Sequence, residues 1–553
     1  MTTSQAPQHK PVGFKELVTS LVIAFMLAFV FRGFIIEGFQ IPTGSMAPTL
    51  LGKHIRFTSP HNGYSWTTGP WDNYNGTHIP TKIQGANGLR VTDPMTGLDQ
   101  TESSRKLASG DRVFVLKYLP VLHEPSRWDV VVFKNPGTHE NYIKRLVGLP
   151  GEQLAFVDGD LFTRPFVEGQ TATAGFDAWE ATDWTPARKS ERVQRIMFQD
   201  VFDSRYAPVT VDPSYRAPFE STTPGWDGLR TDSSYTYSNA TPTILQWNND
   251  KPITDRNSYN QTSIVFDMSM SPTDPKNGNR NFRPFYASDI ALSADIQLDG
   301  SHITTTPTIS ARGHQFRAIV NTADGSASVE MKSDASDSAW QTLDSTTFAK
   351  PSASDIISIE FWHVDQALWL FINDALACGG PEAGAYQMTP LALATAATSL
   401  DRAALEAESA GGAGVIKPGV LARPEIYKPS TVAWNFDNGP FTLHNVRVQR
   451  DINYRNMPAE QSGRATRGGH PNFFPTLNDD EFFMCGDNSS RSQDSRLWAQ
   501  NEIVPWVERL VDDRAGMVNE DLVVGKAFVV YWPSMLKESK VPAPDAGRVR
   551  WIW

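Results

Sequence analysis

The stretch DVVVFKNPGTHENYIKRLVGLPGE, residues 129–152, contains two apolar runs that are separated by a polar segment with Pro136 and Gly137. Both runs are rich in β-branched residues, and Pro and Gly bound them, so the pattern predicts short strands over 129–134 and 142–149. The stretch therefore favours a β-rich core over a helical one.

Similar runs lie on either side of this stretch. RVFVLKYL (112–119) precedes it, while EFFMCGDN (481–488) and LVVGKAFVVYWP (522–533) come near the end of the chain. LAFVDGDLF (154–162) reads as a hairpin, because an Asp158-Gly159 pair suits a tight primed turn. These segments predict one mainly β core, built from two parts of the chain that lie far apart in sequence.

The chain also carries a long apolar segment near its N-terminus. LVTSLVIAFMLAFVF (17–31) has no charge, and after Arg32 the segment continues apolar to Ile36. About 20 such residues suffice to cross a bilayer if Arg32 reaches the interface, so we expect a single membrane span over 17–36. A cleavable signal peptide fits less well, because no small-residue cleavage site follows. A buried core helix also fits less well, because a helix that is apolar on every face would be unusual at the start of a soluble chain.

A different composition marks residues 165–445, which are rich in Thr, Ser, Asp and Asn. Turn residues separate several strand-like runs there, and this pattern predicts an antiparallel β-sandwich. The runs are IALSADIQL (290–298), FRAIVN (316–321), ASVEMK (327–332), IISIEFWHV (356–364) and ALWLFIND (367–374). Their order resembles laminin-G or concanavalin-like sandwiches. The Ala-rich piece at 392–414 is compatible with a short helix, a loop or disorder.

Composition excludes some classes of function. The formal net charge of −11 supplies no basic face for phosphates, so we expect no nucleic-acid partner. Cys378 and Cys485 are too few for a thiolate zinc site; they form either one bridge or two buried free thiols. The segment TSPHNGYSW (58–66) has the outline of a zinc knuckle without its cysteines. We expect neither a metal nor another cofactor.

The segment FQIPTGSMAPTL (39–50) places Ser45 in a turn between Gly44 and Pro48. A serine in a turn can expose its hydroxyl near converging backbone N–H groups, as a nucleophile beside an oxyanion hole requires. The eleven histidines show no spacing typical of a triad. Lys144 is the alternative base, because a lysine buried in an apolar strand loses its charge more readily and can accept a proton from a serine.

These segments together resemble the successive motifs of type I signal peptidases. FQIPTGSMAPTL, DRVFVLKY, RWDVVVFKNP, YIKRLVGLPGE, GDNSSRSQDSR (486–496) and VGKAFVVYWP occur in that order after one N-terminal span. The resemblance covers less than half of the chain. It implies a β catalytic domain on the outer face of the membrane, which cuts signal peptides after small residues at positions −1 and −3.

The resemblance also implies roles for individual residues. Ser45 matches the nucleophile and Lys144 the general base; Thr43 would add an oxyanion-hole hydroxyl, and Ser492 would orient the lysine amine. The implied structural ion pairs join Asp494 to Arg496 and Asp487 to Arg145. The positions implied to line the substrate pockets are Phe39, Ile41, Met46, Leu50, Tyr142 and Ile143.

Two departures from the family pattern stand out. SSR (489–491) replaces the more usual acidic and amide residues before Ser492. This difference bears on the geometry of the loop and affects no catalytic group. A polar insertion over about 56–108 separates the Ser45 motif from DRVFVLKY. The predicted division of the chain is an N-terminal tail (1–16), a transmembrane anchor (17–36), a first core part (37–164), an inserted sandwich (165–445), a second core part (446–535) and a C-terminal tail (536–553).

The resulting hypothesis is a single-pass membrane endopeptidase with its N-terminus in the cytoplasm and its catalytic domain on the outer side of the cytoplasmic membrane. Its expected partners are preprotein signal peptides, membrane lipid and the protein-translocation machinery. The numbers of positive charges on the two sides of the span are nearly equal, so we infer this orientation from the expected function and not from the charges. The alternative is an inactive peptidase scaffold that presents a glycan- or protein-binding sandwich at the cell surface.

Overall fold

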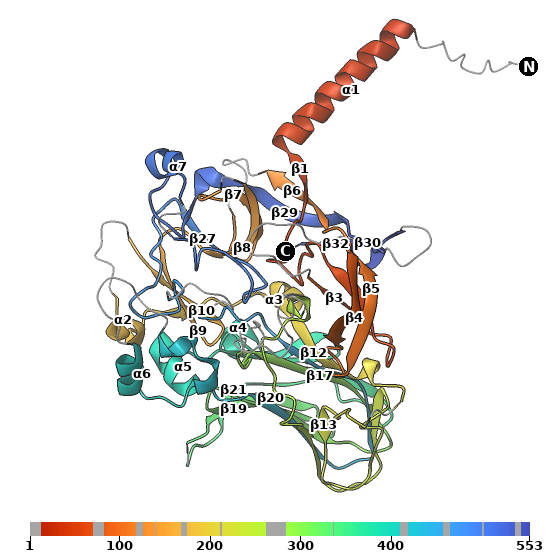
Figure 1. The fold of residues 1–553 in the computed structure, drawn as a ribbon. Helices are drawn as coiled ribbons and strands as arrows, with labels where there is room; N and C mark the ends of the chain where they lie inside the picture. Colours follow the sequence, from red (N-terminus) through yellow and green to blue (C-terminus); the bar gives the residue numbers. More distant parts are fainter. Residues whose placement is uncertain are drawn as a thin grey trace, which may run out of the picture.

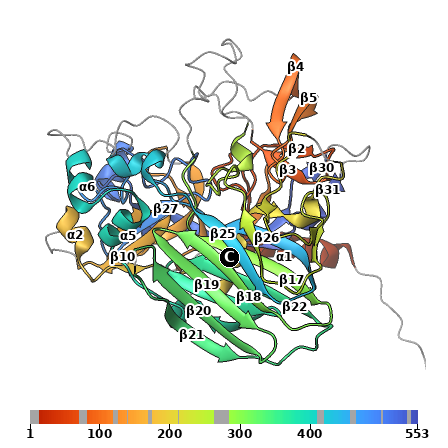
Figure 2. The ribbon, with the colours of Figure 1, turned by 90° about the horizontal axis from the view of Figure 1, so that it is seen from below.

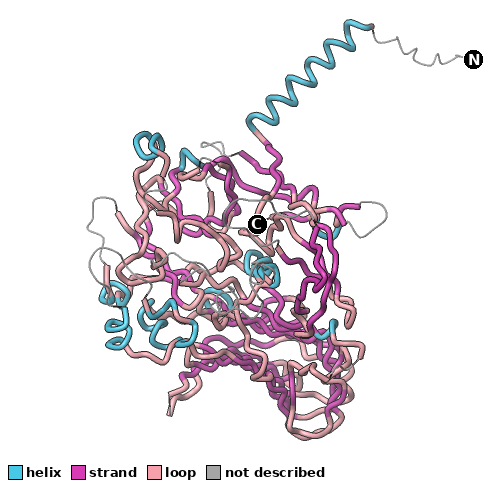
Figure 3. Tube along the Cα trace, in the orientation of Figure 1, coloured by secondary structure: helices cyan, strands magenta, loops and turns pink. Residues whose placement is uncertain are grey.

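A computed structural model of the chain describes residues 13–69, 82–117, 125–138, 140–167, 174–210, 213–261, 284–335, 337–409, 419–456, 465–499, 503–536 and 543–552. Strands form most of the regular structure in these residues (Figure 3). The predicted fold class, a mainly β chain with one N-terminal apolar helix and a large β insertion, is confirmed. Residues 1–12 of the predicted N-terminal tail (1–16) and residues 70–81 of the polar insertion lie outside the described residues.

Helix α1 (Phe14–Phe34) projects away from the rest of the molecule (Figure 1). Its 21 residues correspond to about 30 Å, the thickness of a bilayer core. The most apolar 18-residue window has a mean hydropathy of 2.2, and none of it is buried. By length and composition α1 is therefore a candidate membrane span. It ends two residues before the predicted limit of the span, because strand β1 begins at Ile36.

The core is an antiparallel eight-stranded sheet that joins both predicted parts of the core. Its order is β1-β6-β29-β7-β8-β27-β28, with β32 beside β29. These strands are β1 (Ile36–Gln40), β6 (Arg112–Lys117), β7 (Val130–Lys134), β8 (Asn141–Gly148), β27 (Glu481–Cys485), β28 (Val518–Asn519), β29 (Val523–Trp532) and β32 (Arg550–Trp551). Pairing of β8 with β27 brings Cys485 opposite Arg145, so the 486–496 segment starts beside the strand that carries Lys144.

The predicted hairpin is β9 (Glu152–Val157) and β10 (Asp160–Pro165), to which β11 (Thr185–Pro186) adds a third strand. Asp158 and Gly159 have φ angles of 50° and 92°, as the expected primed turn requires. Every residue of β9 after Glu152 is buried, because the strand packs on both faces. One face contributes to a hydrophobic cluster that includes Phe483 of the core, and the other to a cluster that includes Leu393.

The inserted segment forms two antiparallel sheets. The first has the order β14-β15-β26-β17-β22-β23-β24, with β12 beside β26, and the second has the order β13-β16-β25-β18-β19-β20-β21. The first comprises β12 (Gln199–Asp203), β14 (Trp226–Asp227), β15 (Ser234–Tyr237), β17 (Ile290–Leu298), β22 (Ile356–Val364), β23 (Ala367–Ile372), β24 (Ala375–Gly379) and β26 (Phe441–Arg450). The second comprises β13 (Phe219–Glu220), β16 (Thr243–Trp247), β18 (Thr304–Ala311), β19 (His314–Asn321), β20 (Ser326–Ser333), β21 (Gln341–Thr347) and β25 (Thr431–Asp437).

The two sheets enclose one hydrophobic cluster, as the sandwich prediction requires. Side chains of both sheets, among them Leu292, Phe361, Phe316 and Trp434, belong to that cluster. Burial alternates along β18, so one face of this strand is directed to the interior. Seen from below, β18 to β21 lie side by side across the molecule (Figure 2).

The remaining strands form two-stranded pairs, and the helices after α1 are short. They are the two-stranded pairs β2 (Ile55–Thr58) with β3 (Ser65–Thr68), β4 (Lys82–Thr92) with β5 (Asp99–Lys106) and β30 (Met535–Leu536) with β31 (Ala543–Pro544), and the helices α2 (Phe176–Glu180), α3 (Glu191–Met197), α4 (Gly380–Ala383), α5 (Pro390–Ala397), α6 (Arg402–Ser409) and α7 (Pro505–Leu510). The Ala-rich piece thus forms two short helices up to Ser409. Cys378 and Cys485 are both buried free thiols.

The core and the inserted segment share buried contacts. Ala155, Val157 and Phe162 of the hairpin pack with α5 and with Tyr427 in one hydrophobic cluster. Arg312, in the turn between β18 and β19, is 1% exposed and pairs with Asp158 and Asp160 of the hairpin. The division at residues 165 and 445 stays a prediction, but the inserted segment is closely packed on the core rather than attached only at its two ends.

Candidate active site

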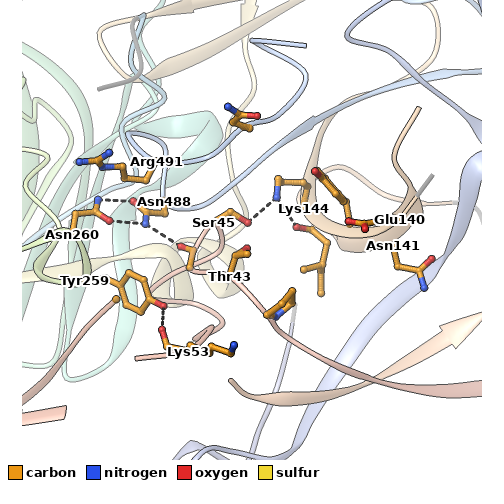
Figure 4. A pocket seen from close by; sticks show the side chains of 16 residues that line it. Thr43, Ser45, Lys53, Glu140, Asn141, Lys144, Tyr259, Asn260, Asn488 and Arg491 are labelled. Atoms are coloured by element: carbon orange, nitrogen blue, oxygen red, sulfur yellow. Dashed lines mark hydrogen bonds between the residues drawn. The ribbon is translucent and has the colours of Figure 1, made fainter. Parts of the chain in front are cut away.

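A cleft of about 300 Å³ lies between the loop after β1 and the first residues of β8. Both Ser45 and Lys144 line it. The other lining residues are Pro42, Thr43, Gly44, Lys53, Gly69, Glu140, Asn141, Tyr142, Ile143, Tyr259, Asn260, Asn488, Arg491 and Gln493. The cleft therefore collects residues from both parts of the predicted core and from the inserted segment (Figure 4).

Ser45 lies in the loop that follows β1. Ile41, Met46 and Leu50 of this loop are at most 2% exposed and pack with core valines such as Val113. These buried residues hold both sides of the loop against the sheet and leave Ser45 half-buried at the surface of the cleft. Apolar residues at the flanking positions thus fix the loop and present the Ser45 hydroxyl to the cleft.

Lys144 reaches the same point from β8. Its side chain is almost fully buried, and Nζ lies 2.7 Å from Ser45 Oγ and 3.2 Å from the carbonyl oxygen of Ile143. Burial lowers the pKa of Lys144 from its usual 10.5 to about 8, and the negative charges of Asp494 and Asp487 oppose part of this shift. A neutral amine is therefore accessible near neutral pH, and it can accept the serine proton.

Two buried ion pairs hold the 486–496 loop against this site. Arg145 donates from Nε and Nη2 to the two carboxylate oxygens of Asp487, at 2.7 and 2.5 Å. Arg496 pairs with Asp494 at 2.8 Å, and Asp494 also accepts from the backbone N–H of Gly486. Adjacent residues of a strand project to opposite faces, so Lys144 can contact Ser45 while Arg145 fixes the loop. Both predicted pairings are present.

Ser492 lies close to these groups. It is 1% exposed, and a Cβ placed on Gly486 would lie 2.2 Å from Ser492 Oγ and 2.5 Å from the carbonyl oxygen of Ser45. Only glycine fits at position 486 for this reason. Within the described part of the chain, Ser492 Oγ has no hydrogen-bond partner and makes no bond to Lys144. Its predicted role as the group that orients the amine stays a prediction.

The other predicted site residues divide into two groups. Thr43, Tyr142 and Ile143 line the cleft with Ser45. Phe39, Ile41, Met46 and Leu50 instead belong to the hydrophobic cluster beneath the loop and are not among the residues that line the cleft.

Sequence reasoning missed several lining residues. Asn488 follows Asp487 directly in the GDN motif, so the motif itself could have indicated it. Tyr259 and Asn260 come from the inserted segment, where no recognisable motif surrounds them. No pattern in the sequence pointed to these two.

Comparison with known proteins agrees with this arrangement. The family model described as signal peptidase, peptidase S26, matches residues 14–68, 94–190 and 436–532. A signal peptidase I of Buchnera aphidicola subsp. Schizaphis graminum is 31% identical over 150 residues, 27% of this chain and 33% of the relative. A signal peptidase I of Pseudomonas aeruginosa is 30% identical over 171 residues, 29% of this chain and 43% of the relative. The chain thus spans less than half the length of these relatives.

Among solved structures, a carbohydrate-binding module, CBM66 from Bacillus subtilis, aligns with 42% of this chain and 96% of its own. The identity is 8% and the TM-score 0.22, so no conclusion about ligands follows. The matched segments of the family model, by contrast, include Ser45, Lys144 and the whole 486–496 loop. In these three segments the chain is similar to the signal peptidase family, peptidase S26.

Proposed function

We propose that this protein is a membrane-anchored serine endopeptidase that removes signal peptides from translocated preproteins, with Ser45 as nucleophile and Lys144 as general base. The observation that carries the proposal is the 2.7 Å contact between Lys144 Nζ and Ser45 Oγ in a cleft where burial lowers the lysine pKa to about 8. The match of three segments to the signal peptidase family model supports the substrate class.

The proposed reaction proceeds through an acyl-enzyme. The neutral Lys144 amine accepts the Ser45 proton while Oγ attacks the carbonyl carbon of the scissile bond. The resulting ammonium then gives its proton to the leaving amine as the C–N bond breaks. A water molecule, deprotonated by the same amine, attacks the ester, and Ser45 recovers its proton as the signal peptide leaves with a new carboxylate.

The tetrahedral intermediate needs donors for its oxyanion. The backbone N–H of Ser45 makes no hydrogen bond within the described part of the chain, so it is available to a substrate oxygen. Thr43 lines the cleft two residues away, and its hydroxyl would supply the second donor.

The edge of the sheet offers a place for an extended substrate. β1 stands at the end of the strand order and, among the described strands, pairs only with β6. An extended peptide can add to such an edge through main-chain hydrogen bonds. Pro42 and Thr43, which follow β1, line the same cleft as Tyr142 and Ile143. A peptide along this edge would therefore bring its scissile bond to Ser45.

The position of α1 supports a membrane location. The helix leads directly into β1, and only the 41–44 segment separates that strand from Ser45. An anchor so close to the nucleophile would hold the cleft near the bilayer surface, where signal-peptide cleavage sites emerge. The proposed topology places the N-terminus in the cytoplasm and the cleft on the outer side. Lipid and the translocation machinery stay proposed partners.

A peptide with Ala-x-Ala before the scissile bond tests the proposal. Detergent-solubilised protein should cut it after the second alanine, whereas Phe or Lys at position −1 or −3 should suppress kcat/KM by at least ~10²-fold, because a shallow pocket admits neither the volume nor the charge. Cleavage sites are read by mass spectrometry. Equal cutting of the bulky peptides would refute the substrate class, and no cutting at all would favour the alternative of an inactive scaffold.

Cleavage should also depend on pH. Because Lys144 must be neutral to accept a proton, kcat/KM should rise about tenfold per pH unit below the lysine pKa of about 8 and level off above it. Initial rates between pH 6 and 10 on the Ala-x-Ala peptide measure the profile. A rate that stays constant between pH 6 and 8 would exclude Lys144 as the titrating base.

A further inference from the structure

A turn of the inserted segment reaches the nucleophile loop. The short 3-10 helix η2 (Ser258–Asn260) lies between β16 and β17 of the sandwich, yet Tyr259 and Asn260 line the same cleft as Ser45. Both side chains are buried, at 5% and 4% exposed. Asn257 stabilises the turn by accepting the N–H of Tyr259 at 2.9 Å.

Tyr259 packs against the residue that precedes Ser45. A Cβ placed on Gly44 would lie 1.9 Å from the Tyr259 ring, so the ring is in direct contact with the Gly44 backbone. The Tyr259 hydroxyl donates to the carbonyl oxygen of Lys53 at 2.6 Å, at the far end of the same loop. The turn thus contacts the nucleophile loop on both sides of Ser45.

Asn260 acts on the same loop through Asn488. Their carboxamides form a reciprocal pair, with Asn260 donating at 2.7 Å and Asn488 donating at 2.9 Å. Asn488 Nδ2 also donates to the carbonyl oxygen of Gly44 at 2.9 Å, and its backbone N–H donates to the carbonyl oxygen of Ser45 at 3.0 Å. One asparagine therefore holds the carbonyl groups on both sides of the nucleophile, and Asn260 sets which way its amide faces.

This arrangement determines the direction of the Ser45 N–H. In a trans peptide the C=O and N–H bonds point in opposite directions, so fixing the Gly44 carbonyl toward Asn488 turns the Ser45 N–H away from Asn488. Figure 4 shows Asn488 and Lys144 on opposite sides of Ser45. The N–H that would bind the oxyanion is thereby held in place before substrate arrives, as an oxyanion hole requires.

We propose that Asn260 is a positioning residue for catalysis: through Asn488 it orients the Gly44–Ser45 peptide, so the inserted segment holds the oxyanion donor of the core in place. The inference rests on the proposed peptidase function. It also gives the insertion a part in the chemistry, beyond binding or spacing.

The test compares Asn260→Ala, Asn488→Ala and the double variant of the full-length protein. We expect Asn260→Ala to lower kcat on the Ala-x-Ala peptide by roughly 10- to 100-fold with KM changed less than about threefold, because the oxyanion donor acts mainly in the transition state. In the Asn488→Ala background, Asn260→Ala should cause no further loss, since the two residues act in series. Asn239→Ala, at an exposed sandwich position that donates to Pro224, is the matched control and should retain wild-type kcat.

Three results would overturn the inference. They are a wild-type kcat in Asn260→Ala, an effect of Asn260→Ala on KM alone, and a decrease of kcat in the double variant that equals the product of the decreases in the two single variants. If Asn260→Ala is unfolded by circular dichroism, the isosteric Asn260→Asp replaces it. Asp places an oxygen against Asn488 Oδ1 and should lower kcat in the same way.

A second readout separates this inference from the proposed function. The rate at which p-nitrophenyl acetate acylates Ser45, followed by mass spectrometry, depends on the oxyanion hole but not on peptide recognition. Wild-type protein that is acylated but cuts no peptide would refute the peptidase proposal, and a slower acylation of Asn260→Ala would still support the positioning role. Wild-type protein that is neither acylated nor active would overturn both.

Discussion

Ser45→Ala and Lys144→Met are each expected to reduce cleavage of the Ala-x-Ala peptide by on the order of 10⁴-fold or more. The first removes the only hydroxyl to which Lys144 Nζ is hydrogen-bonded in the described part of the chain, and the second removes the group that accepts its proton. Because the two groups act as one unit, the double variant should be no less active than either single variant. Progress curves by liquid chromatography measure all three.

Matched controls separate this effect from damage to the fold. Ser65→Ala alters an exposed serine of β3, and Lys134→Met alters a lysine of β7, the strand beside β8, that does not line the cleft. Both should keep activity within about threefold of wild type. Near-wild-type turnover of Lys144→Met, with the protein folded, would show that another group is the base.

The second large effect concerns stability. Arg312→Met should lower the free energy of unfolding by about 3–5 kcal/mol, because it leaves buried carboxylates without their cation. Arg312 Nε lies 2.8 Å from Asp158, and Nη2 lies 2.6 Å from Asp160 and 3.1 Å from Asp289. Carboxylate oxygens of Asp160, Asp289 and Asp365 also approach within 4.8 Å of one another, so their repulsion would increase once the guanidinium is lost.

The loss should depend on pH. Burial already raises the pKa values of Asp158 and Asp289 above their usual range, and removing Arg312 would raise them further. Carboxyls whose pKa is higher in the folded than in the unfolded state bind extra protons on folding. The deficit of the variant relative to wild type is therefore full above the raised folded pKa values and should shrink as the pH falls toward the unfolded value of about 3.9.

Urea unfolding of both proteins in detergent at pH 7.5 and pH 5 measures this difference. Arg447→Met is the matched control, because Arg447 forms a partly exposed ion pair with Asp200 in the same sandwich, and its loss should change stability by no more than about 1 kcal/mol. Equal, small effects of the two variants would show that Arg312 is not required to neutralise the buried carboxylates.

Some parts of the molecule could be predicted from the sequence more closely than others. Strands with strong β-branched runs were located closely: IALSADIQL and IISIEFWHV coincide with β17 and β22 residue for residue. The Asp158-Gly159 turn was also predicted, because its positive φ angles favour few residue types. Such features depend on the conformational preferences of neighbouring residues, so they can be predicted without the tertiary structure.

The residues assigned to the substrate pocket could not be placed from local sequence alone. Phe39, Ile41, Met46 and Leu50 were assigned to the pocket from the resemblance, and this role stays a prediction. They pack in the cluster beneath the loop together with Ile143, which lines the cleft as well. An apolar residue near a nucleophile fits either place equally well in sequence. Only the direction of each side chain relative to the sheet distinguishes them.

By itself, the sequence determined the class of core, the apolar N-terminal helix and the pair of residues, Ser45 and Lys144, that the structure brings within 2.7 Å. These depend on local propensity and on motifs that keep their order along the chain. The tertiary structure alone decided that Arg312 of the sandwich neutralises the hairpin carboxylates and that Asn260 reaches Asn488 beside the nucleophile. The sequence around an arginine or asparagine in a polar turn does not indicate which residue it will bind. The contacts of Arg312 with Asp158 and of Asn260 with Asn488 join residues more than 150 positions apart, and they form only when the sheets pack.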